Sequence, residues 1–227
     1  MQTLKNKNLT VDISEFGAEL QSIRNTNGKE YLWQGIPEIW NGRSPALFPI
    51  VGRIKNDTLS VDGKEYTLNK HGFARKSEFE VVKITETSVS YMLKSNAETK
   101  NQYPYDFEFY IHYELVNNTV SVTYEVKNTD NREIYFSLGA HPGFNCKMGD
   151  FLEFENNETL ETYVMNEEAY ITKKIPYLTN ENRITITEDI FKNDALMFEN
   201  TNSKSITLKS NDDFSVCVKY YNARFLG

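Results

Sequence analysis

Several features that mark particular classes of protein are scarce or missing in this sequence. It has two cysteines, Cys146 and Cys217, which are too few for the disulfide framework of a small secreted domain. No apolar run approaches the ~20 residues that a membrane-spanning helix needs. The first residues, MQTLKNKNLTVDISEFG, contain no hydrophobic segment of the signal-peptide type. We therefore expect a cytoplasmic protein that does not enter a membrane.

Positive charge is also in short supply. The formal net charge is −7 at pH 7, and the lysines and arginines are scattered along the chain rather than clustered. Nucleic acids and anionic lipid surfaces are bound through concentrated basic patches. The charge pattern therefore argues against a nucleic acid or a membrane surface as a partner.

What the sequence does contain favours β-strands. It has 14 tyrosines and 14 phenylalanines, and apolar and polar residues alternate along several segments, as they do in strands with one buried face. Segments 205–211 and 214–221 show this alternation. So does segment 107–115, where one face consists of Phe107, Phe109, Ile111, Tyr113 and Leu115.

Turn signals separate these segments at the spacing of about 8–12 residues that is typical of a β-sandwich or barrel. Asp62-Gly63 and Asn117-Asn118 predict hairpin turns. A short helical turn is expected at 164–170 and another near 188–196. No linker or repeat divides the chain, so we predict one mostly antiparallel all-β domain over residues 1–227.

The chain has three histidines, and one of them needs no function to explain it. His112 lies on the polar side of a predicted strand, among glutamates. A solvated or cross-strand histidine in such a position is common, and no motif surrounds it.

His71 lies in the segment NKHGFARKSEF, where Gly72 leaves room and Arg75 supplies a fixed positive charge. If this segment is extended, the side chains of His71, Phe73 and Arg75 point the same way and line one patch. The alternative is a loop histidine beside a surface arginine. The spacing alone does not choose between the two interpretations.

His141 lies in SLGAHPGFN, at the end of a predicted strand. Pro142 restricts the backbone before it, and Gly139 and Gly143 remove side chains on both sides, as happens where a ligand approaches the main chain. The alternative is structural, because Pro142 and Gly143 suit the central positions of a type II turn. Both interpretations stay open on spacing alone.

Other kinds of chemistry find less support in the sequence. The three histidines lack the short spacing of a zinc site, and the two cysteines do not supply it. There is no G-x-S-x-G nucleophile elbow, P-loop or dinucleotide-binding fingerprint. The aromatic residues could stack on sugars, although aromatic residues at this density more often fill a β core.

Five segments in this order resemble the aldose 1-epimerase (galactose mutarotase-like) superfamily, and within it the LacX-like bacterial branch: SPALFPIVGRI, HGFAR, YPYDFEFYIHYEL, YFSLGAHPGFN and FKNDALMFEN. The resemblance runs from about residue 10 to the last residue. It implies a large antiparallel β-sandwich of the galactose mutarotase type, without a cofactor or a metal, and a small-molecule sugar bound across an open concave face.

The resemblance also implies roles for individual residues. His141 matches the general acid that protonates the ring oxygen, and His71 matches a second histidine that helps to hold that oxygen. Arg53 and, less securely, Asp194 match residues that contact the sugar. Arg75 of the HGFAR motif is placed to touch a more anionic substrate, such as a sugar phosphate.

The general base of the family is a glutamate, which the resemblance places beyond residue 227, after a stretch similar to YYNARFLG. Glu199 lies outside the corresponding motif. We therefore expect the domain to lack its C-terminal strands here, as a fragment of a longer enzyme or as a sugar-binding relative without the base.

The leading hypothesis is an isomerase that interconverts the α and β anomers of a hexose by acid–base ring opening. The alternatives are a hexose 6-phosphate 1-epimerase and a non-catalytic carbohydrate-binding protein of the same fold.

Overall fold

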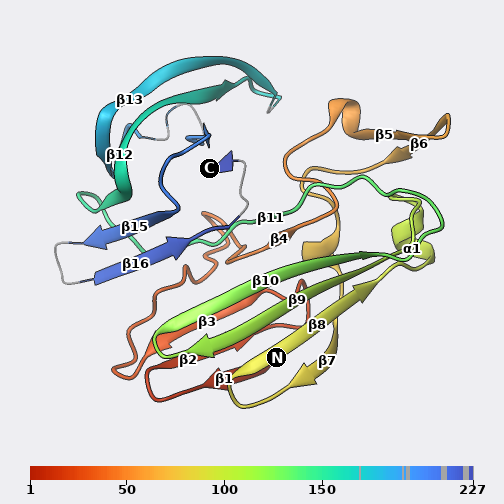
Figure 1. Ribbon diagram of the computed structural model, residues 1–227, viewed down its shortest axis with the longest axis horizontal. Helices are drawn as coiled ribbons and strands as arrows, with labels where there is room; N and C mark the ends of the chain where they lie inside the picture. The colour runs from red at the N-terminus through yellow and green to blue at the C-terminus, as the bar shows by residue number, and fades with distance from the viewer. Residues whose placement is uncertain (169, 191, 193–194, 211–213, 222–224, 227) are drawn as a thin grey trace. The chain divides into compact units, whose positions relative to one another are not determined.

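The computed structural model describes the chain except for residues 169, 191, 193–194, 211–213, 222–224 and 227 (Figure 1). The chain divides into two compact units, Met1–Asn145 and Cys146–Gly227. Strands make up nearly all of the regular structure in both units, which confirms the predicted all-β class. In the described part of the chain, no helix is both long enough and apolar enough to cross a bilayer.

Two antiparallel sheets form the body of the first unit (Figure 1). One has the order β1-β2-β3, and the other has the order β10-β9-β8-β7. The strands of the first sheet are β1 (Gln2–Lys5), β2 (Leu9–Ile13) and β3 (Leu20–Asn25). Those of the second are β7 (Glu80–Ile84), β8 (Ser88–Lys94), β9 (Phe107–Val116) and β10 (Thr119–Asn128).

The buried face of β9 is the face that the alternation predicted. Its five apolar residues from Phe107 to Leu115 are each at most 5% exposed and belong to one core with Val11 and Ile13 of β2. The Tyr113 hydroxyl crosses this core to donate a hydrogen bond to the Ala18 carbonyl oxygen at 2.7 Å. The two sheets therefore pack face to face as a β-sandwich.

Short elements outside the two sheets lead to the candidate site residues. Strand β4 (Ala46–Leu47) pairs with β11 (Gly139–Ala140). The 3-10 helix η1 (Lys55–Asp57) precedes the hairpin of β5 (Thr58–Val61) and β6 (Lys64–Thr67), and a second 3-10 helix, η2 (Ala74–Lys76), follows it. Asp62 and Gly63 both have positive φ in the hairpin turn, as predicted. Asn117, in the turn between β9 and β10, also has positive φ.

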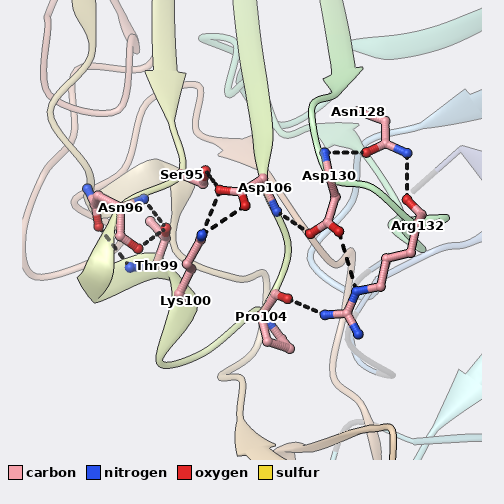
Figure 2. Close-up of polar contacts among 9 residues, drawn as sticks. All are labelled: Ser95, Asn96, Thr99, Lys100, Pro104, Asp106, Asn128, Asp130 and Arg132. Carbon is pink, nitrogen blue, oxygen red and sulfur yellow. Dashed lines mark hydrogen bonds and ion pairs between the residues drawn. The ribbon is translucent and has the colours of Figure 1, made fainter.

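A polar network holds the chain where β9 begins and β10 ends (Figure 2). Asp106 accepts a hydrogen bond from Ser95 at 2.8 Å and forms an ion pair with Lys100 of the one-turn helix α1 (Ala97–Lys100). Asp130 accepts from the Asp106 backbone N–H at 2.8 Å, and Arg132 donates to the Pro104 carbonyl oxygen at 2.6 Å. This network fixes the start of the segment that runs on to β11 and His141.

The second unit contains a four-stranded sheet of order β13-β12-β15-β16. It also contains a two-stranded sheet, in which β14 pairs with β17. Its core includes Phe154, Leu178 and Phe198. The strands predicted at 205–211 and 214–221 are confirmed as β15 and β16. The strands of this unit are β12 (Phe151–Met165), β13 (Ile171–Thr185), β14 (Phe198–Glu199), β15 (Ser205–Ser210), β16 (Phe214–Lys219) and β17 (Phe225–Leu226).

The helical turn predicted at 164–170 is wrong. Strand β12 continues to Met165, and β13 begins at Ile171. Between them the Asn166 backbone N–H donates to the Tyr170 carbonyl oxygen, and the Asn166 side chain accepts from the Tyr170 N–H. Strand pairing across this connection satisfies the backbone, so a helix has no advantage here. Residues 188–190 form a turn, and part of the rest of 188–196 lies outside the described residues.

Candidate functional site

Two of the three histidines, 70 positions apart in the chain, lie side by side in the first unit. The ring centroids of His71 and His141 are 6.2 Å apart, with 60° between the ring planes. The segment at β4 brings them together, because Leu47 pairs with Gly139 of β11 and Phe48 forms a β-bridge with Gly72. The structure thus places both candidate catalytic imidazoles within the span of one small ligand.

His71 is held to Gly52 at two points. The His71 backbone N–H donates to the Gly52 carbonyl oxygen at 2.8 Å, and the Gly52 N–H donates to His71 Nδ1 at 3.0 Å. An Nδ1 atom that accepts a hydrogen bond carries no proton, so the proton of the neutral ring is on Nε2. His71 therefore presents a hydrogen-bond donor at Nε2.

The surroundings of His71 also keep its ring uncharged. Burial, and after it the charges of Arg75, Lys70 and His141, together lower its pKa from 6.5 to about 4. At neutral pH this imidazole donates a hydrogen bond without carrying a positive charge.

His141 has different surroundings. The residue is exposed, and its backbone N–H donates to the Pro45 carbonyl oxygen at 3.1 Å. Neither of its ring nitrogens has a hydrogen-bond partner among the residues that the structure describes. The nearest rings are Trp40, with centroids 5.2 Å apart, and His71. Both ring nitrogens of His141 are therefore unengaged by the described residues and available for hydrogen bonds with a ligand.

The glycines on either side of His141 make room for protein side chains. A Cβ on Gly139 would lie 3.0 Å from Val51 Cγ2, and one on Gly143 would lie 2.8 Å from Trp40 Cζ3. These contacts give the two glycines a structural reason, and the interpretation that they clear the backbone for a ligand stays a prediction. The type II turn is wrong, because such a turn needs a positive φ at Gly143 and this residue does not have one.

Arg53 directly follows Gly52 and is therefore tied to the segment that holds His71. Its Nε atom lies 3.0 Å from Asp57 Oδ1, four positions along the chain in η1. The side chains of Arg53 and Asp57 are 37% and 30% exposed. The ion pair restrains the guanidinium and leaves its exposed part available for contact with a ligand.

The segment around Arg75 is not extended, so the prediction that His71, Phe73 and Arg75 line one patch is wrong. His71 and Gly72 both have positive φ, and η2 begins at Ala74. Phe73 turns into the core, where its ring lies edge-on to Phe48 with centroids 6.3 Å apart. Arg75 donates to the Lys70 carbonyl oxygen at 3.1 Å, and its charge still acts on His71.

Asp194 lies outside the described residues. Glu199 belongs to the second unit, where its carboxylate accepts a hydrogen bond from the Tyr163 hydroxyl and pairs with Lys174 at 3.2 Å. His112 is a cross-strand residue, as predicted, with Nδ1 2.8 Å from Ser90 Oγ and Nε2 3.3 Å from Glu125.

Two residues of this site were missed by sequence reasoning. Gly52 acts through its backbone N–H, and its only signal is its place beside Arg53 in the sequence GRI. Trp40 is followed by Gly42, which leaves space for a large ring, but no short motif links it to His141. Both contacts join segments that are far apart in the chain.

The fold and this site together define an all-β protein with a neutral imidazole donor and a free imidazole side by side. The chain belongs to the aldose 1-epimerase family, because the model of that family, described as aldose 1-epimerase, matches residues 1–226. It is 34% identical over 224 residues to the plasmid-encoded protein LacX of Lactococcus lactis subsp. lactis, in an alignment that covers 91% of this chain and 75% of that protein. The resemblance inferred from the sequence is confirmed.

Solved structures give the same result for the fold. A galactose mutarotase related enzyme from Lactobacillus acidophilus matches with a TM-score of 0.94 and 36% identity, covering 99% of this chain and 78% of that one. A galactose mutarotase-like protein from Lactobacillus casei matches with a TM-score of 0.92 and 28% identity, covering 99% and 81%. The predicted β-sandwich of the galactose mutarotase type is therefore confirmed.

Proposed function

We propose that this protein interconverts the α and β anomers of a hexose, with His141 as the general acid and His71 as the donor that holds the ring oxygen. The observation that carries the proposal is the pair of imidazoles 6.2 Å apart, one of them fixed as a neutral Nε2–H donor. Membership of the aldose 1-epimerase family supports the same reaction.

The residue types suit this chemistry. A base removes the proton from the hydroxyl on C1, and an acid gives a proton to the ring oxygen. The bond between C1 and the ring oxygen breaks, and the oxygen on C1 becomes a carbonyl oxygen. Rotation about the C1–C2 bond and closure on the other face return both protons. A positioned acid or base contributes about 10²–10⁴ in rate, and an imidazole can donate and recover a proton near neutral pH.

The other predicted roles stay part of the proposal. The exposed guanidinium of Arg53 contacts sugar hydroxyls, and Asp194 is assigned the same task. The general base remains a glutamate predicted beyond residue 227. The cytoplasmic location also stays a prediction.

Polarimetry of freshly dissolved α-galactose and α-glucose tests the proposal directly. With the predicted glutamate present, we expect the protein to accelerate the approach to equilibrium, and His141→Ala and His71→Ala each to lower the rate enhancement about 10²–10⁴-fold. The matched control is His112→Ala, because that histidine contacts Ser90 and Glu125 instead of the other two histidines. Equal losses in all three variants would contradict the assignment.

The rival from another class, a carbohydrate-binding protein without catalysis, makes a different prediction. In that case a hexose raises the Tm of the protein, but the protein does not accelerate mutarotation in the polarimeter. That outcome in a protein that includes the predicted glutamate would refute the isomerase and leave the sugar site.

A second candidate substrate, a hexose 6-phosphate, is favoured by the charges around His71. Lys70 and Arg75 both act on that ring, and the buried Arg75 Nε atom has no hydrogen-bond partner among the described residues. If phosphate binds here, Arg75→Gln raises KM for glucose 6-phosphate about tenfold, the loss of one charged hydrogen bond, and leaves KM for galactose unchanged. Acceleration with galactose and none with glucose 6-phosphate would remove this candidate.

A further inference from the structure

A general acid must be aimed at one atom of its substrate, and catalytic histidines are commonly oriented by a hydrogen bond to the second ring nitrogen. His71 has such a bond from the Gly52 N–H. Within the described part of the chain, His141 has none at either nitrogen, although its ring is exposed. Its orientation must therefore come from packing.

The packing partner that fits this task is Trp40. Its ring centroid lies 5.2 Å from that of His141, with 60° between the planes. At this separation two rings are in contact, and a tilted arrangement avoids the unfavourable face-to-face sandwich. It restricts rotation of the imidazole about its χ2 bond.

The Trp40 ring lies against the backbone of two glycines. A Cβ on Gly42 would lie 2.7 Å from Trp40 Cζ2, and one on Gly143 would lie 2.8 Å from Cζ3, so the backbone closes on the ring from two sides. The Trp40 carbonyl oxygen accepts a hydrogen bond from Trp33 Nε1 at 2.8 Å. The Gly143 N–H donates to the Arg43 carbonyl oxygen at 2.7 Å, which ties the His141 segment to the Trp40 segment.

We propose that Trp40 is the positioning residue of His141: its indole sets the direction of the imidazole in place of a hydrogen bond. This inference rests on the proposed function for its catalytic consequence, but the orientation itself is a property of the free protein. It also gives Gly42 and Gly143 a role, because both leave space for the indole.

Kinetics of Trp40→Leu and Trp40→Phe test the catalytic part. Misaimed acids lose rate rather than affinity, so we expect kcat of Trp40→Leu to fall about 10- to 100-fold with KM changed less than about twofold. Trp40→Phe keeps an aromatic edge and retains most of the rate. Tyr135→Leu is the control, since it removes an exposed aromatic side chain from the same unit.

A double-mutant cycle separates positioning from general damage. If Trp40 acts through His141, then Trp40→Leu causes no further decrease in kcat in a protein that already carries His141→Ala. A loss of the same size in both backgrounds, or a loss carried entirely by KM, would overturn the proposal.

Proton NMR of the histidine rings provides a readout that does not depend on activity. Trp40→Leu should shift the His141 Cε1–H resonance, through loss of the indole ring current, and reveal a second orientation or broadening, while His112 stays unchanged. Trp40→Phe should give an intermediate shift and serves as the folded variant if leucine is not tolerated. A sharp His141 signal with a single orientation in Trp40→Leu would refute the positioning role. A shifted signal in a protein with no mutarotase activity would support the orientation while refuting the proposed function.

Discussion

At the scale of single residues, the surroundings give one residue type two different properties. His71 is partly buried, accepts the Gly52 N–H at Nδ1 and lies near two cations, so its neutral Nε2–H form is favoured. His141 is exposed, and among the described residues its imidazole lies beside the rings of Trp40 and His71. The two imidazoles therefore differ in their surroundings, and only His71 has its tautomer fixed by a backbone hydrogen bond that the structure describes.

The low pKa of His71 predicts how stability depends on pH. The unfolded chain takes up a proton on this residue as the pH falls through about 6.5, whereas the folded protein does so only near 4. The contribution of His71 is fully present above pH 6.5 and is lost as the pH falls to 4. Urea unfolding between these pH values should show the free energy of unfolding decreasing.

His71→Asn isolates this contribution. The asparagine Oδ1 atom can accept the Gly52 N–H as Nδ1 does but does not titrate. We expect a flatter pH dependence between 6.5 and 4 in this variant, and His112→Asn should leave the slope of the wild type in place. A slope unchanged by His71→Asn would show that His71 is not its source.

At the scale of elements, the contact between the β4 segment and the HGFAR segment builds the site. Phe73 and Ala74 donate their backbone N–H groups to the Phe48 carbonyl oxygen at 3.1 and 3.2 Å. A Cβ on Gly72 would lie 2.2 Å from that same oxygen, and its φ is +66°. Only glycine fits both the space and the backbone conformation, and His71 is placed by this contact.

Gly72→Ala should therefore unfold the protein more easily than an ordinary glycine substitution. We expect the free energy of unfolding to fall by about 3 kcal/mol, because the added methyl group clashes with the backbone and because alanine disfavours the left-handed conformation. Gly63→Ala is the matched control, since its φ is +78° but a Cβ there meets nothing within 4 Å. Its expected loss is about 1 kcal/mol. Equal losses in denaturant unfolding would contradict the contact.

At the scale of the whole molecule, the two compact units each have their own core. The core of Met1–Asn145 lies between two sheets, joined by the hydrogen bond from Tyr113 to Ala18. In Cys146–Gly227 the buried carboxylate of Glu158 accepts hydrogen bonds from the Ser203 N–H at 2.7 Å and the Asn202 N–H at 3.1 Å. The single domain predicted from the sequence remains a proposal that unfolding experiments can test.

One domain should unfold in one transition. We expect Tyr113→Phe in the first unit to cost about 1 kcal/mol and Glu158→Gln in the second to cost about 2–3 kcal/mol, the usual values for a neutral and a charged hydrogen-bond partner. Both substitutions should move the same calorimetric peak. Two peaks, each moved by one substitution, would show two independently folding domains.

Much of the secondary structure could be predicted because it depends on local patterns. The buried face of β9 follows from strict alternation, and the β5–β6 turn follows from Asp62-Gly63. The helical turn at 164–170 was wrong because pairing between β12 and β13 outweighs local preference. The patch of His71, Phe73 and Arg75 was wrong because it assumed an extended backbone.

The sequence by itself determined the all-β class, the hairpins and the family. Alternation, turn residues and short motifs each involve residues that are close together in the chain. Only the tertiary structure decided what surrounds His71 and His141. The partners of the two rings, Gly52 and Trp40, come from segments 19 and 101 positions away. A backbone N–H is present at nearly every residue, so no residue type marks the one that fixes a tautomer. Contacts of this kind exist only once the chain has folded.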